Sequence, residues 1–93
     1  MDYSAGTKTE EVRETLVVSE KEKSIVLYND DYNTFDHVID CLVDICDHNP
    51  FQAEQCAMIV HYKGKCGVKS GSLKKLHPLK SALSLKGLDA IIE

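Results

Sequence analysis

The sequence predicts a small α+β sandwich, in which a three-stranded antiparallel sheet carries three helices on one side. The chain has 93 residues, which is enough for one small domain. Short segments rich in β-branched residues alternate with longer segments whose apolar residues recur every three to four positions. The resulting order is strand, helix, helix, strand, helix, strand. The order of the strands within the sheet stays open at this point.

The first two elements follow a polar beginning of the chain. Residues 1–23 are polar and charged with one short apolar run, so we expect a flexible N-terminal arm before a folded domain of residues 24–93. Residues 24–28 read SIVLY and predict the first strand. Asn33 is a suitable N-cap for a first helix of residues 34–48, because its side-chain oxygen can accept a bond from a free backbone N–H group.

The second helix has start and stop signals at both ends. Asn49 and Pro50 are suited to the cap and the first helical position, and Gly64 is suited to the end. Apolar residues occupy most sides of this helix, so we expect it to be deeply buried. Residues 65–69 alternate apolar and polar side chains and predict a second, short strand.

Leucines at helical spacing predict a third helix, which ends before Gly87. Pro78 lies inside this pattern and either kinks the helix or marks its true start, because proline lacks the N–H group that the helix needs. Residues 88–93 predict the last strand.

Composition and charge indicate a soluble, cytoplasmic protein. No apolar run approaches the ~20 residues of a membrane span, and the first residues lack a signal-peptide pattern. The four cysteines show no Cys-x-x-Cys spacing, so we expect buried thiols rather than a disulfide framework. Acidic residues dominate between Lys23 and Lys63, whereas residues 63–86 hold seven lysines and no acid. This asymmetry indicates either two solvated faces or two faces that each meet a partner of opposite charge.

A polar cluster where the first strand ends is the strongest candidate site. Asn29, Asp30 and Asp31 follow the strand directly, and His61 lies near the end of the second helix. Together they offer several hydrogen-bond acceptors, which suit the three donors of a protonated α-amino group. Apolar residues that could line an adjoining pocket are Phe35, Val38, Ala57, Val60 and Leu88. The alternative is ordinary turn and cap chemistry beside a packed histidine.

Two segments, YNDDYNTFDHVIDCL and AEQCAMIVHYKGKCGV, resemble the ClpS family of adaptor proteins. The resemblance covers roughly residues 24–93. It implies a non-enzymatic adaptor that binds substrates through a hydrophobic N-terminal residue and delivers them to a Clp-type AAA+ unfoldase for proteolysis. In this family pattern Asn29, Asp30 and His61 would hold the α-amino group and first peptide unit, and Asp31 would support their loop. The five apolar residues named above would line the side-chain pocket.

The resemblance also implies the partners. It implies contact with the N-terminal domain of the unfoldase, a delivery role for the arm before residue 24, a monomer, and neither a cofactor nor a nucleic-acid or membrane partner. The chain departs from the family in having Asn33-Thr34-Phe35 where Thr-Pro-Met is usual, and Ala57 where Met or Leu is usual. The loop after Gly64 is shorter than usual. The family's charged docking positions fall near Ser72 and His77, so that contact does not transfer.

Three other functions remain open on the sequence alone. A metal-dependent enzyme could use Asp30, Asp31 and His61, or the pair His37 and Cys41 four residues apart. A nucleic-acid or ribosome-associated module could use the lysines of residues 63–86. A ClpS-like protein could also modulate the unfoldase without recognising N-terminal residues.

Overall fold

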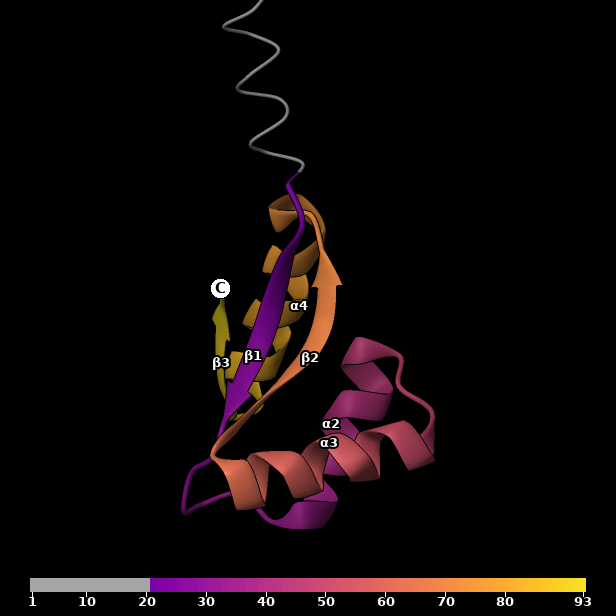
Figure 1. Ribbon diagram of the computed structural model, residues 1–93, viewed down its shortest axis with the longest axis vertical. Helices are drawn as coiled ribbons and strands as arrows, with labels where there is room; N and C mark the ends of the chain where they lie inside the picture. The colour runs from indigo at the N-terminus through magenta and orange to yellow at the C-terminus, as the bar shows by residue number, and fades with distance from the viewer. Residues whose placement is uncertain (1–20) are drawn as a thin grey trace, which may run out of the picture.

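The computed structural model describes residues 21–93, and the prediction of a flexible arm therefore lies almost wholly outside the described residues. Within them, the elements follow the predicted order (Figure 1). They are β1 (Lys23–Tyr28), α2 (Phe35–Cys46), α3 (Pro50–Lys63), β2 (Lys65–Gly71), α4 (Leu73–Leu85) and β3 (Asp89–Ile92). No helix within this range is both long enough and apolar enough to cross a membrane.

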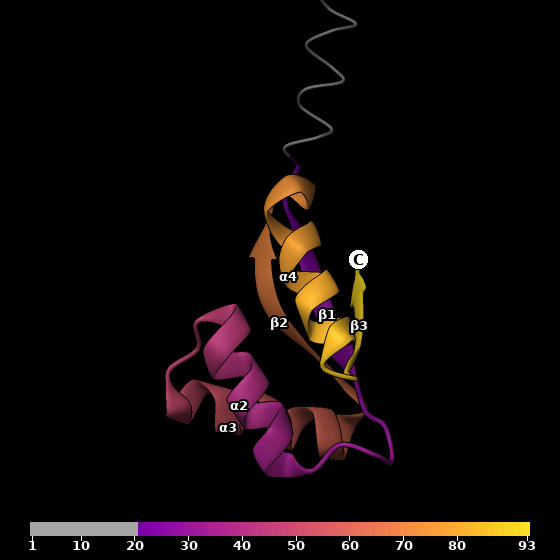
Figure 2. The same ribbon diagram turned by 180° about the vertical axis from the view of Figure 1, so that it is seen from behind.

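The three strands form one antiparallel sheet in the order β2-β1-β3, which confirms the predicted fold class. β1 is the central strand, and its Val26 faces Gly67 on one side and Ile91 on the other. α4 runs along one face of the sheet, α2 lies on the same side of the molecule, and α3 crosses the end at which β1 leaves the sheet (Figures 1 and 2). The loop from β1 into α2 therefore lies next to the end of α3.

The core lies between the sheet and α4 and continues into the α2–α3 pair. Its largest fully buried side chains are Ile25, Leu27, Leu42, Leu76, Leu83 and Cys46. These side chains come from β1, α2 and α4, and the residues from each element lie on one face of it. Burying one such apolar side chain contributes about 1.5–3 kcal/mol. This shared core fixes α2 and α3 relative to the sheet.

The cap of α2 differs from the prediction. The N-cap is Thr34, whose hydroxyl accepts a bond from the His37 N–H at 3.1 Å, and Asn33 lies one residue before it. The helix ends at Cys46 rather than at His48, because Asp47 adopts the left-handed conformation with φ 61°. His48 then turns inward, where it is 5% exposed and its Nε2 donates to the Val68 carbonyl oxygen at 2.6 Å.

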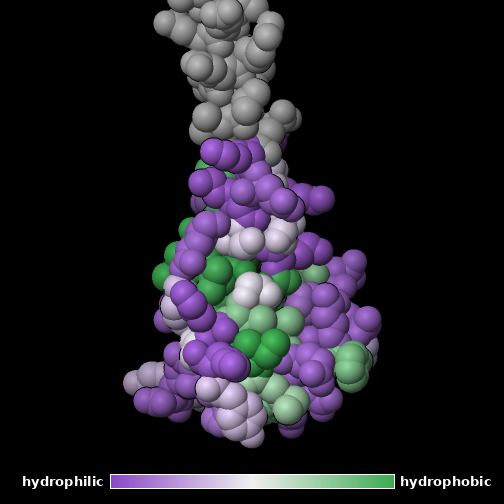
Figure 3. Space-filling model, viewed as in Figure 1, coloured by the Kyte–Doolittle hydropathy of each residue, from purple (hydrophilic) through white to green (hydrophobic). Residues whose placement is uncertain are grey.

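The caps of α3 are as predicted, but its burial is not. The Asn49 side chain accepts a bond from Gln52 N–H at 2.8 Å, and Gly64 ends the helix with φ 94°. Only Ala53, Ala57 and Val60 are buried, and the exposed large hydrophobic side chains of this helix are Phe51, Met58, Ile59 and Tyr62. The expectation of deep burial was wrong because α3 lies at the end of the domain and packs along one side only. Figure 3 shows the consequence, a band of hydrophobic residues that extends from the open face of the sheet onto α3.

The boundaries of β2 and α4 differ slightly from those predicted from the sequence. β2 extends to Gly71, two residues beyond the predicted strand, and Ser72 caps α4 through a bond from the Lys75 N–H. α4 continues through Pro78, so the proline does not mark the start of the helix. Pro78 and Lys74 are both exposed, so water can reach the Lys74 carbonyl that lacks its usual helical donor.

Candidate functional site

The loop between β1 and α2 is organised by the carboxylate of Asp30. Its Oδ1 accepts bonds from the backbone N–H groups of Tyr32 and Asn33, each at 2.8 Å. Its Oδ2 accepts a bond from the Asn33 side-chain amide at 2.7 Å. Burial by itself would raise the pKa of Asp30, but these hydrogen bonds outweigh it, and the pKa is lower than the ordinary value. Asp30 is therefore a stable negative charge at neutral pH.

Asn33 connects this loop to a distant turn. Its Nδ2 donates to Asp30 and also to the backbone carbonyl oxygen of Gly87, at 2.9 Å. Gly87 has φ 89°, a conformation that favours glycine, and follows Lys86, the C-cap of α4. The sequence suggested a helix cap for Asn33, and this bridging role was missed. Its only sequence signal is an asparagine three residues after an aspartate at the end of a strand.

The end of α3 meets the same loop from the other side. The backbone N–H of Asn29 donates to the Gly64 carbonyl oxygen at 2.9 Å, which joins the start of the loop to the C-cap of α3. His61 lies in the last turn of that helix, and its ring contacts the Phe35 ring edge-to-face with 6.1 Å between centroids. Two segments that are distant in sequence thus form opposite walls of one hollow.

This hollow is a cavity of about 330 Å³. Its lining residues are Asn29, Asp30, Asp31, Asn33, Phe35, Val38, Ala57, Val60 and His61. These are the predicted site residues except Leu88, with Asn33 added. Leu88 lines a small adjoining cavity of about 20 Å³, which shares Val38 and Val60 with the larger one. The structure therefore brings the predicted residues together at one place, while their roles stay predictions.

The cavity combines two kinds of surface. Amide and carboxylate oxygens lie on the side of the β1–α2 loop, and Phe35, Val38, Ala57 and Val60 provide apolar walls. Among the described lining residues there are two aspartates and no lysine or arginine, so the local potential favours a cation. A ligand with a compact positive charge next to an apolar group fits both surfaces.

The alternative chemistries find less support. Within residues 21–93 no group of three or more His, Cys, Asp or Glu side chains is placed to hold a metal ion. His37 Nε2 lies 3.6 Å from Cys41 Sγ, but the same nitrogen contacts the Lys86 carbonyl oxygen at 2.9 Å. His37 thus fastens α2 to the end of α4, and the pair does not present an open ligand set.

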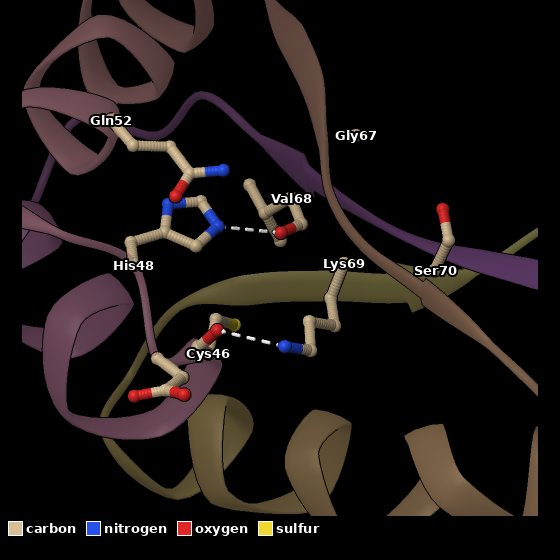
Figure 4. A pocket seen from close by; sticks show the side chains of 8 residues that line it. Cys46, His48, Gln52, Gly67, Val68, Lys69 and Ser70 are labelled. Carbon is tan, nitrogen blue, oxygen red and sulfur yellow. Dashed lines mark hydrogen bonds between the residues drawn. The ribbon is translucent and has the colours of Figure 1, made fainter.

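A second hollow, of about 410 Å³, lies where the α2–α3 linker meets β2 (Figure 4). Its polar groups already make structural contacts: His48 donates to the Val68 carbonyl, and Lys69 Nζ donates to the Cys46 carbonyl oxygen at 3.1 Å. His48 Nδ1 has no hydrogen-bond partner within residues 21–93. Although this hollow is larger, it lacks the convergent acceptors and apolar walls of the smaller cavity, which is therefore the better candidate site.

Comparison with known proteins places the chain in a family. Residues 19–88 match the family described as ATP-dependent Clp protease adaptor protein ClpS. The protein of that name from Campylobacter jejuni is 33% identical over 63 residues, which are 66% of this chain and 66% of the relative. Its counterpart from Nitratidesulfovibrio vulgaris is 34% identical over 65 residues, which are 68% of this chain and 65% of the relative. The chain thus spans slightly less than two thirds of these relatives' length.

A solved structure shares the fold. The structure of Agrobacterium tumefaciens ClpS2 bound to L-phenylalaninamide superimposes with a TM-score of 0.73 and 20% sequence identity. The match covers 78% of this chain and 95% of that one. At this identity the likeness establishes the fold alone. The family is shown by the match over residues 19–88: the chain belongs to the ClpS family of Clp protease adaptor proteins.

Proposed function

We propose that this protein is an adaptor that binds other proteins by a hydrophobic N-terminal residue and its free α-amino group, and delivers them to a Clp-type AAA+ unfoldase. The observation that carries the proposal is the cavity that joins the acceptors of Asn29, Asp30 and Asp31 to the apolar walls formed by Val38 and Val60. The structure of the relative bound to L-phenylalaninamide supports it, because that ligand carries an amino group beside an apolar side chain.

Each part of such a ligand has a matching part of the cavity. The ammonium group has three donors and meets the acceptors at the β1–α2 loop, where the ionised Asp30 also supplies negative charge. Three of the acceptor sites of this carboxylate are taken by the loop itself, so it contributes mostly through its charge and its remaining lone pair. The Asn29 amide and the His61 ring complete the ring of acceptors. The first side chain of the ligand enters between Phe35 and Val60.

The strength of binding follows from these contacts. A charge-assisted hydrogen bond contributes about 1.5–3 kcal/mol, and burial of one apolar side chain contributes about 1.5–3 kcal/mol. The cost of association offsets several of these contributions, so we expect an isolated peptide to bind with a Kd in the micromolar range. Such an adaptor needs no cofactor and acts as a monomer, since one chain contains the whole cavity.

The test compares two peptides that differ only at the amine. A fluorescent peptide that begins with Phe is titrated with the protein and followed by anisotropy, with a free or an acetylated N-terminus. The proposal expects saturable binding of the free peptide and at least a tenfold loss on acetylation, because the acetyl group removes the positive charge. Equal binding of both peptides would refute the ammonium site.

Variants then locate the binding. Asp30→Ala and His61→Ala should weaken binding of the free peptide. Asp36→Asn is the matched control, because Asp36 is an exposed acid at the start of α2 that does not line the cavity. If Asp36→Asn weakens binding as much as Asp30→Ala does, the effect is general electrostatic attraction rather than a site.

A further inference from the structure

The hollow between the α2–α3 linker and β2 is lined by a buried histidine with one unused ring nitrogen. His48 is 5% exposed, and its Nδ1 is shielded from solvent without a hydrogen-bond partner in residues 21–93. The other ring nitrogen, Nε2, lies 2.6 Å from the Val68 carbonyl oxygen. A carbonyl oxygen can only accept, so Nε2 carries a proton. Buried polar atoms nearly always have a partner, so the unpaired Nδ1 requires an explanation.

A lysine lines the same hollow. Figure 4 shows the Lys69 side chain reaching from β2 toward the end of α2, close to the ring of His48. Its Nζ donates to the Cys46 carbonyl oxygen at 3.1 Å. An ammonium group has three N–H groups, so two remain for other acceptors. The lysine therefore supplies both a full positive charge and free donors to the hollow.

The first turn of α3 adds to the positive charge. Gln52 lines the hollow from this turn, and its exposed side chain lies beside the ring of His48 (Figure 4). The first turn contains no acidic residue, so the partial positive charge at the N-terminus of this 14-residue helix is not offset there. Of the residues that line the hollow, the one acid is Asp47, which is exposed at the C-cap of α2. Donors and positive charge thus predominate.

We infer that this hollow is a second binding site, which takes a phosphate group through Lys69 and His48. A phosphate group carries about 1.5–2 negative charges at neutral pH and has several strong acceptor oxygens, so it suits donors that come from more than one element. One oxygen accepts from Lys69 Nζ and another from His48 Nδ1, which is reached when the exposed Gln52 side chain turns aside. The hollow of about 410 Å³ has room for the group and for part of a molecule that carries it.

This site is separate from the one proposed for N-terminal residues. Gln52 belongs to the first turn of α3, whereas His61 lies in its last turn, so the two hollows are at opposite ends of the helix. The smaller cavity gathers acceptors and has two aspartates among its lining residues, and the larger one gathers donors. Phosphate binding at His48 therefore does not depend on the proposed adaptor function.

Binding at this site requires a second proton on His48. Because Nε2 already carries one, Nδ1 can donate only when the ring is a cation. The charged groups that line the hollow with it are Lys69 from β2, which opposes this proton, and Asp47, which favours it. Cys46 of α2 stays neutral, since burial raises the pKa of its thiol to about 11, and Gln52 of α3 carries no charge. The phosphate adds the negative charge that favours the cation, so binding takes up a proton from solution.

The first experiment observes the histidine rings directly. The whole chain, labelled with ¹⁵N, is titrated with sodium phosphate at pH 7 and constant ionic strength, and the ring nitrogens are followed by long-range ¹H–¹⁵N NMR. The signals of His48 are identified by their loss in His48→Gln. We expect His48 Nδ1 to shift toward the protonated position, with a Kd in the millimolar range, while the rings of His37, His61 and His77 change little. No shift at His48, an equal shift of all four rings, or the same shift with sodium chloride would overturn the inference.

A matched pair of lysine variants locates the binding. Lys69→Met removes the donor and retains most of the apolar stem, and it should weaken phosphate binding about tenfold, because a charge-assisted hydrogen bond is lost. Lys74→Met is the control, because Lys74 is an exposed lysine of α4 that does not line the hollow. Equal weakening by both changes would mean general electrostatic attraction and would refute the site. If Lys69→Met does not fold, the ring titration of the wild-type protein decides the question.

A pH profile separates binding by His48 from a purely structural role. Sulfate is the probe, because its charge stays constant between pH 6 and pH 8, whereas that of phosphate changes. The affinity of the wild type should rise several-fold from pH 8 to pH 6, since the ring gains its second proton in this range. His48→Gln retains a donor for the Val68 carbonyl but gains no proton, so its affinity should not depend on pH. An affinity of the wild type that is independent of pH would overturn the inference, and this holds even if His48→Gln does not fold.

Discussion

The Asp30 carboxylate has a structural part and a proposed chemical part. It accepts the hydrogen bonds that hold the β1–α2 loop in shape, and it supplies negative charge to the cavity. Its bonds to Tyr32, Asn33 and the Asn33 side chain hold the loop in shape. The same bonds favour the ionised form and lower its pKa. A residue that fixed the loop without carrying charge would leave the cavity less attractive to a cation.

Asn33→Ala tests the bridge between this loop and the turn after α4. The change removes the bonds to the Asp30 carboxylate and to the Gly87 carbonyl. We expect a loss of about 1–3 kcal/mol in the free energy of unfolding, measured by urea denaturation. Peptide affinity should fall several-fold, because Asp30 loses its orienting partner. Unchanged stability together with unchanged affinity would show that the Asn33 bridge stabilises neither the β1–α2 loop nor the cavity.

The lowered pKa of Asp30 predicts a pH dependence of stability. A carboxyl whose folded pKa lies below its unfolded pKa stabilises the fold at every pH above the unfolded value, which is 3.8 for this group. That contribution disappears as the pH falls below 3.8 and through the lower folded pKa. Asp30→Asn should therefore be less stable than the wild type at pH 7, with a difference that shrinks near pH 3. Chemical denaturation at pH 7, 5 and 3 measures this, and a difference that does not change with pH would contradict it.

The residues of the site could be named from the sequence, but one of their roles could not. Asn29, Asp30 and His61 were predicted, and they line one cavity. Asn33 was taken for the helix cap because Asn and Thr are both good N-caps, and the sequence has both in succession. Only the distant Gly87 carbonyl, which no local pattern reveals, makes the bridging role evident. Leu88, which was predicted for the same pocket, lines the small adjoining cavity instead.

At the scale of elements, α3 shows what composition leaves open. Its apolar residues surround the helix, and this pattern predicted burial on all sides. The extent of burial depends instead on which neighbours the fold supplies, and α3 has the sheet end and α2 along one side only (Figure 1). The caps, which depend on two or three adjacent residues, were predicted correctly at Asn49 and Gly64.

Two adjacent residues of α3 provide a matched test of this one-sided packing. Val60 is 5% exposed and Ile59 is 42% exposed, and both are β-branched. Val60→Ala should lower the free energy of unfolding by about 1–2.5 kcal/mol, because it leaves a void in the core. Ile59→Ala should cost less than about 1 kcal/mol, since alanine favours the helix and little buried surface is lost. Equal losses would mean that α3 is packed on both sides in solution.

At the scale of the whole molecule, the sheet and its helices position a site that no single element contains. The element order was predictable from periodicity, whereas the strand order β2-β1-β3 was not, because pairing depends on contacts between distant segments. The central place of β1 matters for the candidate site. It lets the loop that leaves the middle of the sheet meet both the end of α3 and the turn after α4.

This arrangement predicts that a ligand in the cavity stabilises the entire fold. A peptide that binds only the folded state at a concentration of 100 Kd adds about 2.7 kcal/mol to the free energy of unfolding. For a domain of this size, that corresponds to a rise in Tm of about 10–20 °C. The rise should occur with a peptide that begins with Phe and should be nearly absent for its acetylated form, because the cavity no longer meets a positive charge. Thermal unfolding across a range of peptide concentrations measures it. A rise of equal size with the acetylated peptide would mean that the apolar walls alone bind the ligand, and that the acceptors of the β1–α2 loop serve only to shape the loop.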